Sequence, residues 1–266
     1  MRAFVFLLSL AFVLPGIHAQ SFSSLAEFWS ASPAKVNQRL NARPLDLSKP
    51  LDRKVRSTMD ELDRLNQMTT TVYWADGYGS NAHPQRGIGL DGRQLAQLVN
   101  TQSESTVDDA IRFILGHEQA HMAQFKYYVS GLDDPQRRRA IECQADILGG
   151  LAFVGTLFRE RRPPETVDFK AMSQHLVDLA FKIGSPGWED QTQHPRPEQR
   201  ARAVTLGMLS QLQIVDWQMY QQTKDPDIMQ RLKSADSRFA DIIKPPEPVM
   251  DWSNTMAKRI VNYAQQ

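Results

Sequence analysis

The sequence predicts an α+β protein that is mainly helical and carries a small antiparallel sheet. Apolar residues recur at helical spacing through 107–129 and again through 166–183. Residues 70–74 are rich in strand-forming side chains and end in a turn-prone stretch, and a second short strand is plausible at 87–90. We therefore expect long helices packed beside a sheet of few strands.

The first residues have the features of a secretory signal. Arg2 precedes a mostly aliphatic run over residues 4–14, which is too short to span a bilayer comfortably. Ala19 offers a small residue for cleavage. We expect residues 1–19 to be a signal peptide that directs the protein to the periplasm or out of the cell, with an uncleaved anchor as the alternative.

Composition narrows the classes of partner. The 266 residues include 31 basic and 30 acidic side chains, so a net charge of +1 gives no reason to expect a nucleic acid. The apolar run at 147–158 is too short for a membrane span, so we expect no spanning helix in the mature chain.

The one cysteine, Cys143, cannot form an internal disulfide. We expect Cys143 to be a small buried residue, with a redox-sensitive thiol as the alternative.

Capping residues predict where several helices begin. A charged helix is expected over about 51–67. The helix with the longest apolar pattern should be capped by Ser105 or Thr106, because a hydroxyl oxygen accepts from free N–H groups at a helix start. Two later helices should begin at Pro135 and near Pro197, since proline fits the first helical turn.

An HExxH motif lies inside the longest predicted helix, at His117, Glu118 and His121. Residues four apart in a helix share one face, so the two imidazoles can bind a single metal ion. Glu118 projects about 100° away, where a general base for a metal-activated water is needed. The motif therefore predicts a zinc-dependent hydrolase.

The third ligand distinguishes classes of HExxH enzyme. The metzincin pattern requires Gly and His where this chain has Gln124 and Tyr127, and a deformylase-like site would use a cysteine before the motif. Glu142 and Asp146, spaced i and i+4 on the next helix, can reach the site instead. We expect Glu142 to bind the metal and Asp146 to accept the ring N–H of a ligating histidine.

Two consecutive glycines, Gly149 and Gly150, follow in the same helix. Each destabilises a helix interior by about 1 kcal/mol relative to alanine. We interpret them as positions where this helix approaches its neighbour closely.

These motifs together resemble the gluzincin pattern of the M48 family of metallopeptidases. Beyond HExxH, the chain has E-x-x-A-D-x-x-G from Glu142 to Gly149, and a His-Pro element at His194 with Arg200 six residues later. The resemblance covers roughly residues 70–205 and implies a zincin-like metallopeptidase core. It differs from many family members, which have several membrane spans.

The resemblance also implies a role for each site residue. It assigns His117, His121 and Glu142 as the zinc ligands and Glu118 as the general base. It assigns Asp146 as a residue that orients a ligand. It assigns His194 and Arg200 as residues that support the transition state or the third ligand.

The organisation that we expect has four parts: a signal peptide at 1–19, a helical N-terminal segment at 20–68, a zinc peptidase core at 69–205 and a C-terminal helical extension at 206–266. The expected function is a zinc-dependent endopeptidase that acts on peptides or unfolded proteins, with protein quality control as the candidate process. Such substrates commonly pair with an edge strand, for which 70–74 and 87–90 are the candidates. The alternative is a chaperone-like binding protein that keeps the metal for stability; oligomeric state stays open.

Overall fold

A computed structural model describes residues 25–76, 79–128, 135–159, 175–176, 178, 197–230 and 232–233. The predicted signal peptide, most of the helical pattern at 166–183 and the candidate residue His194 lie outside the described residues. The described part is mainly helical with one small sheet, which confirms the α+β class.

The sheet has four strands: β1 (Arg43–Pro44), β2 (Val72–Ala75), β3 (Asn81–His83) and β4 (Gly87–Asp91), in the order β1-β2-β4-β3. The two predicted strands correspond to β2 and β4. They pair in parallel, while β1 and β3 pair antiparallel to their neighbours, so the prediction of an antiparallel sheet is wrong. The reason is β3, which the prediction lacked: the chain reverses once into β3 and again into β4, so β4 regains the direction of β2.

Seven helices have defined limits in the described residues: α1 (Leu25–Ser30), α2 (Pro33–Arg39), α3 (Pro50–Asn66), α4 (Gly92–Thr101), α5 (Glu104–Tyr128), α6 (Pro135–Arg159) and α8 (Pro197–Thr223). The predicted helix at 51–67 is α3, and the predicted proline starts of α6 and α8 are confirmed. Helix α8 spans position 205, where the core and the C-terminal helical extension were expected to meet.

Helix α5, which carries the HExxH motif, is capped by a residue that the prediction missed. Ser103 Oγ accepts from the N–H of Thr106 at 3.3 Å, and the Ser103 carbonyl accepts from Val107. Ser105 and Thr106 therefore lie inside the first turn, and the predicted cap is wrong by two or three residues. The physical rule was right, but three neighbouring hydroxyl residues satisfy it equally in the sequence.

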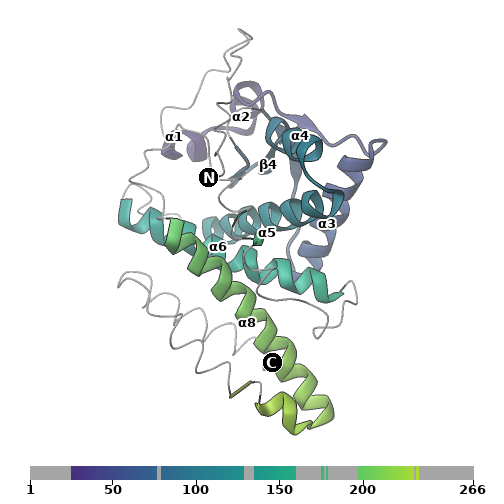
Figure 1. Cartoon of the computed structure of the whole chain (residues 1–266). Helices are drawn as coiled ribbons and strands as arrows, with labels where there is room; N and C mark the ends of the chain where they lie inside the picture. The colour runs from purple at the N-terminus through teal and green to yellow at the C-terminus, as the bar shows by residue number, and fades with distance from the viewer. Residues whose placement is uncertain are drawn as a thin grey trace, which may run out of the picture.

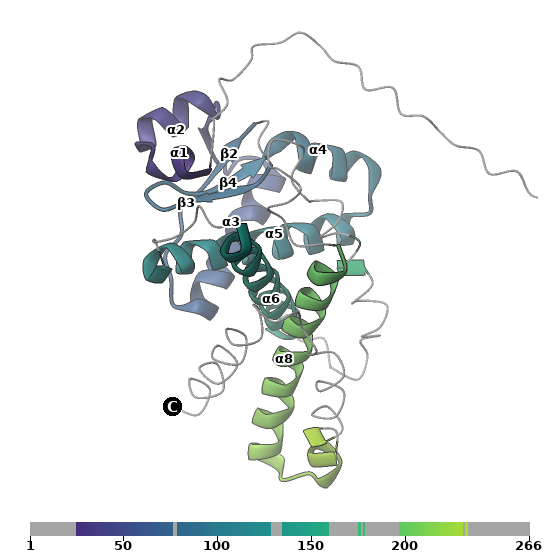
Figure 2. The same ribbon diagram turned by 90° about the vertical axis from the view of Figure 1, so that its left-hand side faces the viewer.

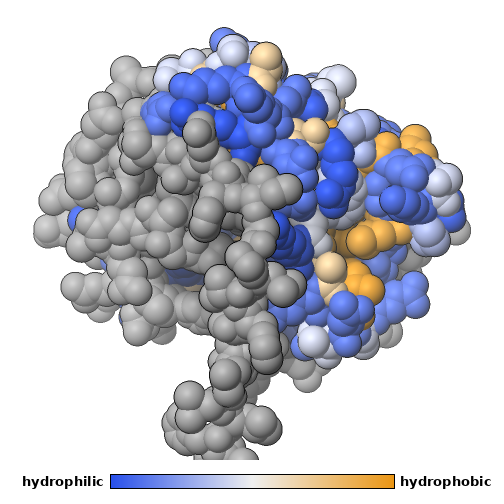
Figure 3. Space-filling view, turned by 90° about the horizontal axis from the view of Figure 1, so that it is seen from above, coloured by the Kyte–Doolittle hydropathy of each residue, from blue (hydrophilic) through white to orange (hydrophobic). Residues whose placement is uncertain are grey.

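Helices α1 and α2 lie on one side of the sheet and α3 and α5 on the other (Figure 2). The buried apolar side chains form two clusters, one on each side. Alternate residues of β2 divide between them: Val72 and Trp74 face the larger cluster, while Tyr73 and Ala75 face the smaller one. The larger cluster joins the sheet to α3, α5, α6 and α8, and the smaller joins it to α1 and α2. Seen from above, the described surface is mainly hydrophilic, with hydrophobic residues in small separate areas (Figure 3).

Glycines allow α6 to pack closely on α5 and α8 (Figure 1). A Cβ on Gly149 would lie 3.3 Å from the backbone nitrogen of His117 in α5, and one on Gly150 would lie 2.4 Å from the Val204 carbonyl oxygen in α8. The predicted close approach is therefore confirmed. The two glycines face two different helices, since consecutive helical residues point about 100° apart.

One stretch of the described chain, Arg139–Leu157 in α6, is long and apolar enough to cross a membrane by length and composition. It is 67% buried inside the protein, as a core helix is. The same stretch contains Glu142 and Asp146, whose side chains meet groups from α5 and α8. Its apolar character is thus accounted for by packing between two helices.

The contact between α6 and α8 should tolerate no added methyl group at Gly207. A Cβ there would lie 1.9 Å from the Ile147 carbonyl oxygen, which cannot move without shifting the helix. Gly207→Ala should therefore lower the free energy of unfolding by about 1–3 kcal/mol, measured by urea unfolding. In the control Gly155→Ala, the Cβ meets the end of the Leu65 side chain at 3.1 Å, so stability should be unchanged or higher. Equal losses in both variants would contradict this account.

Candidate metal centre

The three predicted metal ligands come together between α5 and α6. His117 Nε2 lies 3.1 Å from His121 Nε2, and each nitrogen lies 3.5 Å from one carboxylate oxygen of Glu142. One ligand atom from each residue falls within 4.8 Å of the others. Both imidazoles are buried, and the Glu142 side chain is 17% exposed, so the cluster opens to solvent on the carboxylate side.

These distances fit a tetrahedral zinc ion. Zinc binds imidazole nitrogen and carboxylate oxygen at about 2.0–2.2 Å, which sets tetrahedral ligand atoms about 3.3–3.6 Å apart. The separations of 3.1, 3.5 and 3.5 Å lie close to this spacing. Two nitrogens and one oxygen also match the donor set of catalytic zinc sites, which leave the fourth position for water.

His117 is oriented by a buried carboxylate. Its Nδ1 lies 3.0 Å from Asp146 Oδ1, a close contact whose geometry is not that of a straight hydrogen bond. Asp146 is fully buried and accepts two hydrogen bonds of 2.8 Å from Arg200 Nε and Nη2. The resemblance implied that Arg200 supports the transition state or the third ligand, and the described partner of its guanidinium is Asp146. Arg200 therefore acts on the site through Asp146 and His117.

His121 is oriented by Gln124, a role that the sequence analysis missed. His121 Nδ1 lies 2.7 Å from Gln124 Oε1, which can only accept, so Nδ1 carries a proton and, in the neutral imidazole, Nε2 has the lone pair that a metal needs. The Gln124 amide donates to the Ile141 carbonyl at 3.0 Å and to Gln144 Oε1 at 2.6 Å, both in α6. The available signal was the spacing: Gln124 follows His121 by three residues, on the same helical face.

The charges of the site favour a bound cation. Burial lowers the pKa of His117, but the carboxylates of Asp146 and Glu142 outweigh it and raise that pKa to about 10. Burial likewise opposes protonation of His121, yet the charge of Glu142 raises its pKa. Burial raises the pKa of Glu142, but the two histidines bring it well below its ordinary value. Without metal, the carboxylates thus hold protons on the imidazoles, and a divalent cation would replace them.

The structure places the remaining candidates as follows. Glu118 is buried, and its negative charge contributes to the raised pKa of both histidines, which puts it beside the cluster. Cys143 is buried, and burial raises the pKa of its thiol to about 12, which makes it unreactive as a thiolate. His175 lies 3.3 Å from Asp109, in an ion pair if protonated, and is not grouped with the metal-binding residues.

The edge strand beside the site differs from the two candidates. In the order β1-β2-β4-β3, both β2 and β4 are interior strands, so neither offers a free edge. Helix α5 packs along β3 and β4, and β3 is the edge of the sheet on that side. The edge strand next to the candidate metal centre is therefore β3.

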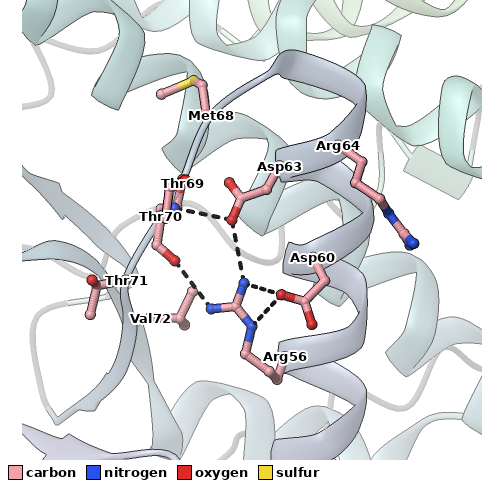
Figure 4. Close-up of a pocket in the computed structure, with 9 residues that line it drawn as sticks. All are labelled: Arg56, Asp60, Asp63, Arg64, Met68, Thr69, Thr70, Thr71 and Val72. Carbon is pink, nitrogen blue, oxygen red and sulfur yellow. Dashed lines mark hydrogen bonds and ion pairs between the residues drawn. The ribbon is translucent and has the colours of Figure 1, made fainter.

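A pocket of about 760 Å³ lies away from the metal-binding residues, between α3 and the segment leading into β2 (Figure 4). Its charged groups bind one another: Arg56 donates to Asp60, to Asp63 and to the Thr70 carbonyl. Asp63 also accepts from the side chain of Gln119 on α5 at 2.8 Å. These contacts hold the face of α5 that points away from the metal.

Comparisons with protein-family models, curated proteins and solved structures found no match to this chain. Its function is therefore inferred from the sequence motifs and the geometry of the site.

Zinc affinity should depend on Gln124. Gln124→Leu removes the acceptor that fixes the His121 tautomer, so affinity should fall about 10- to 100-fold, measured by competition with a chromogenic chelator. Gln119→Leu is a matched control on the opposite face of α5: it breaks bonds to Asp63 and Asn66 and should leave affinity near the wild-type value. A Gln124→Leu protein with unchanged affinity would remove Gln124 from the site.

Zinc binding should release protons at neutral pH. The pKa of His117 is raised from 6.5 to about 10, so below about pH 10 the metal-free protein keeps a proton that zinc must displace. Affinity should therefore rise with pH, by about tenfold per unit for each proton displaced, and level off near pH 10. Calorimetric titration at pH 8 in buffers of different ionisation enthalpy measures the released protons. A value of zero would contradict the charge balance described above.

Proposed function

We propose that this protein is a zinc-dependent endopeptidase of the gluzincin type, with a zincin-like core similar to that of the M48 family. The observation that carries the proposal is the convergence of two buried imidazole nitrogens and one carboxylate at ligand spacing, with Glu118 beside them. A purely structural metal site would have no need of Glu118. Its presence favours hydrolysis over metal storage.

Each side chain of the site has a role in this chemistry. A zinc ion at His117, His121 and Glu142 would act as a Lewis acid on a water molecule and on the scissile carbonyl. Glu118 accepts the proton of the attacking water and can return it to the leaving amine. Gln124 and Asp146 keep both imidazoles in the tautomer that presents Nε2 to the metal.

Arg200 lets Asp146 stay ionised in a dry environment. Burial raises the pKa of Asp146, but the Arg200 guanidinium outweighs it, and the pKa falls below its ordinary value. The two hydrogen bonds between them also fix α8 against α6. The proposed role of Arg200 is thus to position His117 through Asp146, while a role for His194 in stabilising the oxyanion remains part of the proposal from resemblance.

The proposed substrates are peptides or unfolded polypeptides, and the proposed location is the periplasm or the extracellular space, by way of the signal peptide predicted at 1–19. Protein quality control is a process in which a peptidase of this kind would act. The net charge of +1 gives no support for a nucleic-acid partner.

The decisive variant is Glu118→Gln, which keeps the side-chain shape but removes the base. Zinc content should be unchanged, while the rate of casein hydrolysis falls by a factor on the order of 10² or more. Glu104→Gln, at the exposed start of the same helix, is the matched control and should keep full activity. Removal of zinc with a chelator should abolish hydrolysis, and added zinc should restore it.

Two results would count against the proposal. Near-normal hydrolysis by Glu118→Gln would exclude Glu118 as the base. A wild-type protein that holds one zinc ion yet cleaves no unfolded substrate would favour the alternative of a metal-stabilised binding protein.

A further inference from the structure

Helix α1 lies against β3, the edge strand beside the candidate metal centre. The indole Nε1 of Trp29 donates a hydrogen bond of 3.1 Å to the Ala82 carbonyl oxygen in the middle of β3. The Trp29 ring also meets the Phe125 ring of α5 edge to face, with centroids 5.0 Å apart. One side chain from α1 therefore bridges the edge strand and the HExxH helix.

The carbonyl that Trp29 binds points away from the sheet. Ile88 of β4 donates its N–H to the Thr71 carbonyl on the β2 side, at 2.8 Å. Ala82 is the antiparallel partner of Ile88, so this pair does not exchange hydrogen bonds, and the backbone groups of Ala82 face outward. An added strand would pair with this outward carbonyl, and Trp29 occupies it.

The covered edge lies close to the metal-binding residues. Phe125 follows His121 by four residues in α5, so it is on the same helical face and about 6 Å further along the axis. Trp29, packed on Phe125, is therefore about one helical turn from a metal ligand. A polypeptide that paired with β3 would run past His121 only if Trp29 moved.

The attachment of α1 is limited. It has six residues, too few for a stable helix on its own, so its position depends on tertiary contacts. Phe28 packs edge to face on His83 of β3, with centroids 5.2 Å apart, and Glu27 pairs with Lys35 and Arg39 of α2. Phe28 belongs to the smaller core cluster and the larger cluster contains no residue of α1, so α1 can detach without disrupting the larger core.

We propose that the outer edge of β3 is the docking edge for an extended, unfolded polypeptide, and that α1 is a built-in competitor for it. This inference rests on the proposed endopeptidase function. With α1 in place, Trp29 takes the backbone acceptor that a substrate strand would use. When α1 swings away, the polypeptide pairs with β3 through its main chain, which gives binding with little sequence preference. The covered state also protects an exposed strand edge from unwanted pairing.

The test measures binding separately from hydrolysis. In the zinc-loaded Glu118→Gln protein, fluorescein-labelled casein is titrated and its anisotropy gives Kd. Adding Trp29→Ala removes a hydrogen bond and an aromatic contact that favour the covered state, so Kd should fall by about tenfold. Adding Trp29→Phe instead loses only the donor to Ala82 and should lower Kd by a smaller factor. Trp217→Ala, an exposed tryptophan on α8, is the control and should leave Kd unchanged.

Hydrogen exchange locates the binding. In the Trp29→Ala protein, casein should slow amide exchange in the segment 79–86, which contains β3. An unchanged or higher Kd in both Trp29 variants, or tighter binding without protection of 79–86, would overturn the proposal. If Trp29→Ala does not fold, the Trp29→Phe result decides alone. Failure of the endopeptidase function is seen separately, as absence of casein hydrolysis by the zinc-loaded wild-type protein.

Discussion

The site depends on one buried carboxylate, that of Asp146. It is fully buried in α6 and contacts two other helices, through His117 of α5 and Arg200 of α8. An unpaired charge in such a place would destabilise the fold by several kcal/mol, but two hydrogen bonds from one guanidinium satisfy it. The ion pair therefore fixes three helices relative to one another, and the orientation of His117 follows.

The helices can meet at this carboxylate because glycines stand where they cross. Gly149 lets α6 approach the backbone of His117, and Gly150 lets α8 approach from another side. Larger residues would separate α5 from α6 and move Glu142 away from the imidazoles. Close packing and electrostatics thus act together: the glycines set the distance, and the carboxylates at that distance hold positive charge on the two histidines, or on a metal in their place.

The N-terminal part of the chain belongs to the same fold as the site. Strand β1 extends the sheet, Val55 and Met59 of α3 join the larger core, and Phe28 and Val36 join the smaller one. Helix α1 differs from these elements because it is short and also reaches the edge of the sheet, where Trp29 binds Ala82. The tightly packed segments support the site, while α1 sits at the point where a substrate strand would pair.

The sequence by itself determined the helices of the site and the side chains they carry, because local rules govern both. Helical spacing places His117 beside His121, and proline marks the starts of α6 and α8. Tertiary structure alone decided which groups complete the site. The bond from Gln124 to Gln144 of α6, the pairing of Arg200 with Asp146 and the parallel pairing of β2 with β4 depend on how distant segments pack. Spacing along the chain fixes a side chain's direction on its own helix, but the partner it meets is set by the crossing of two helices or the path of an intervening strand.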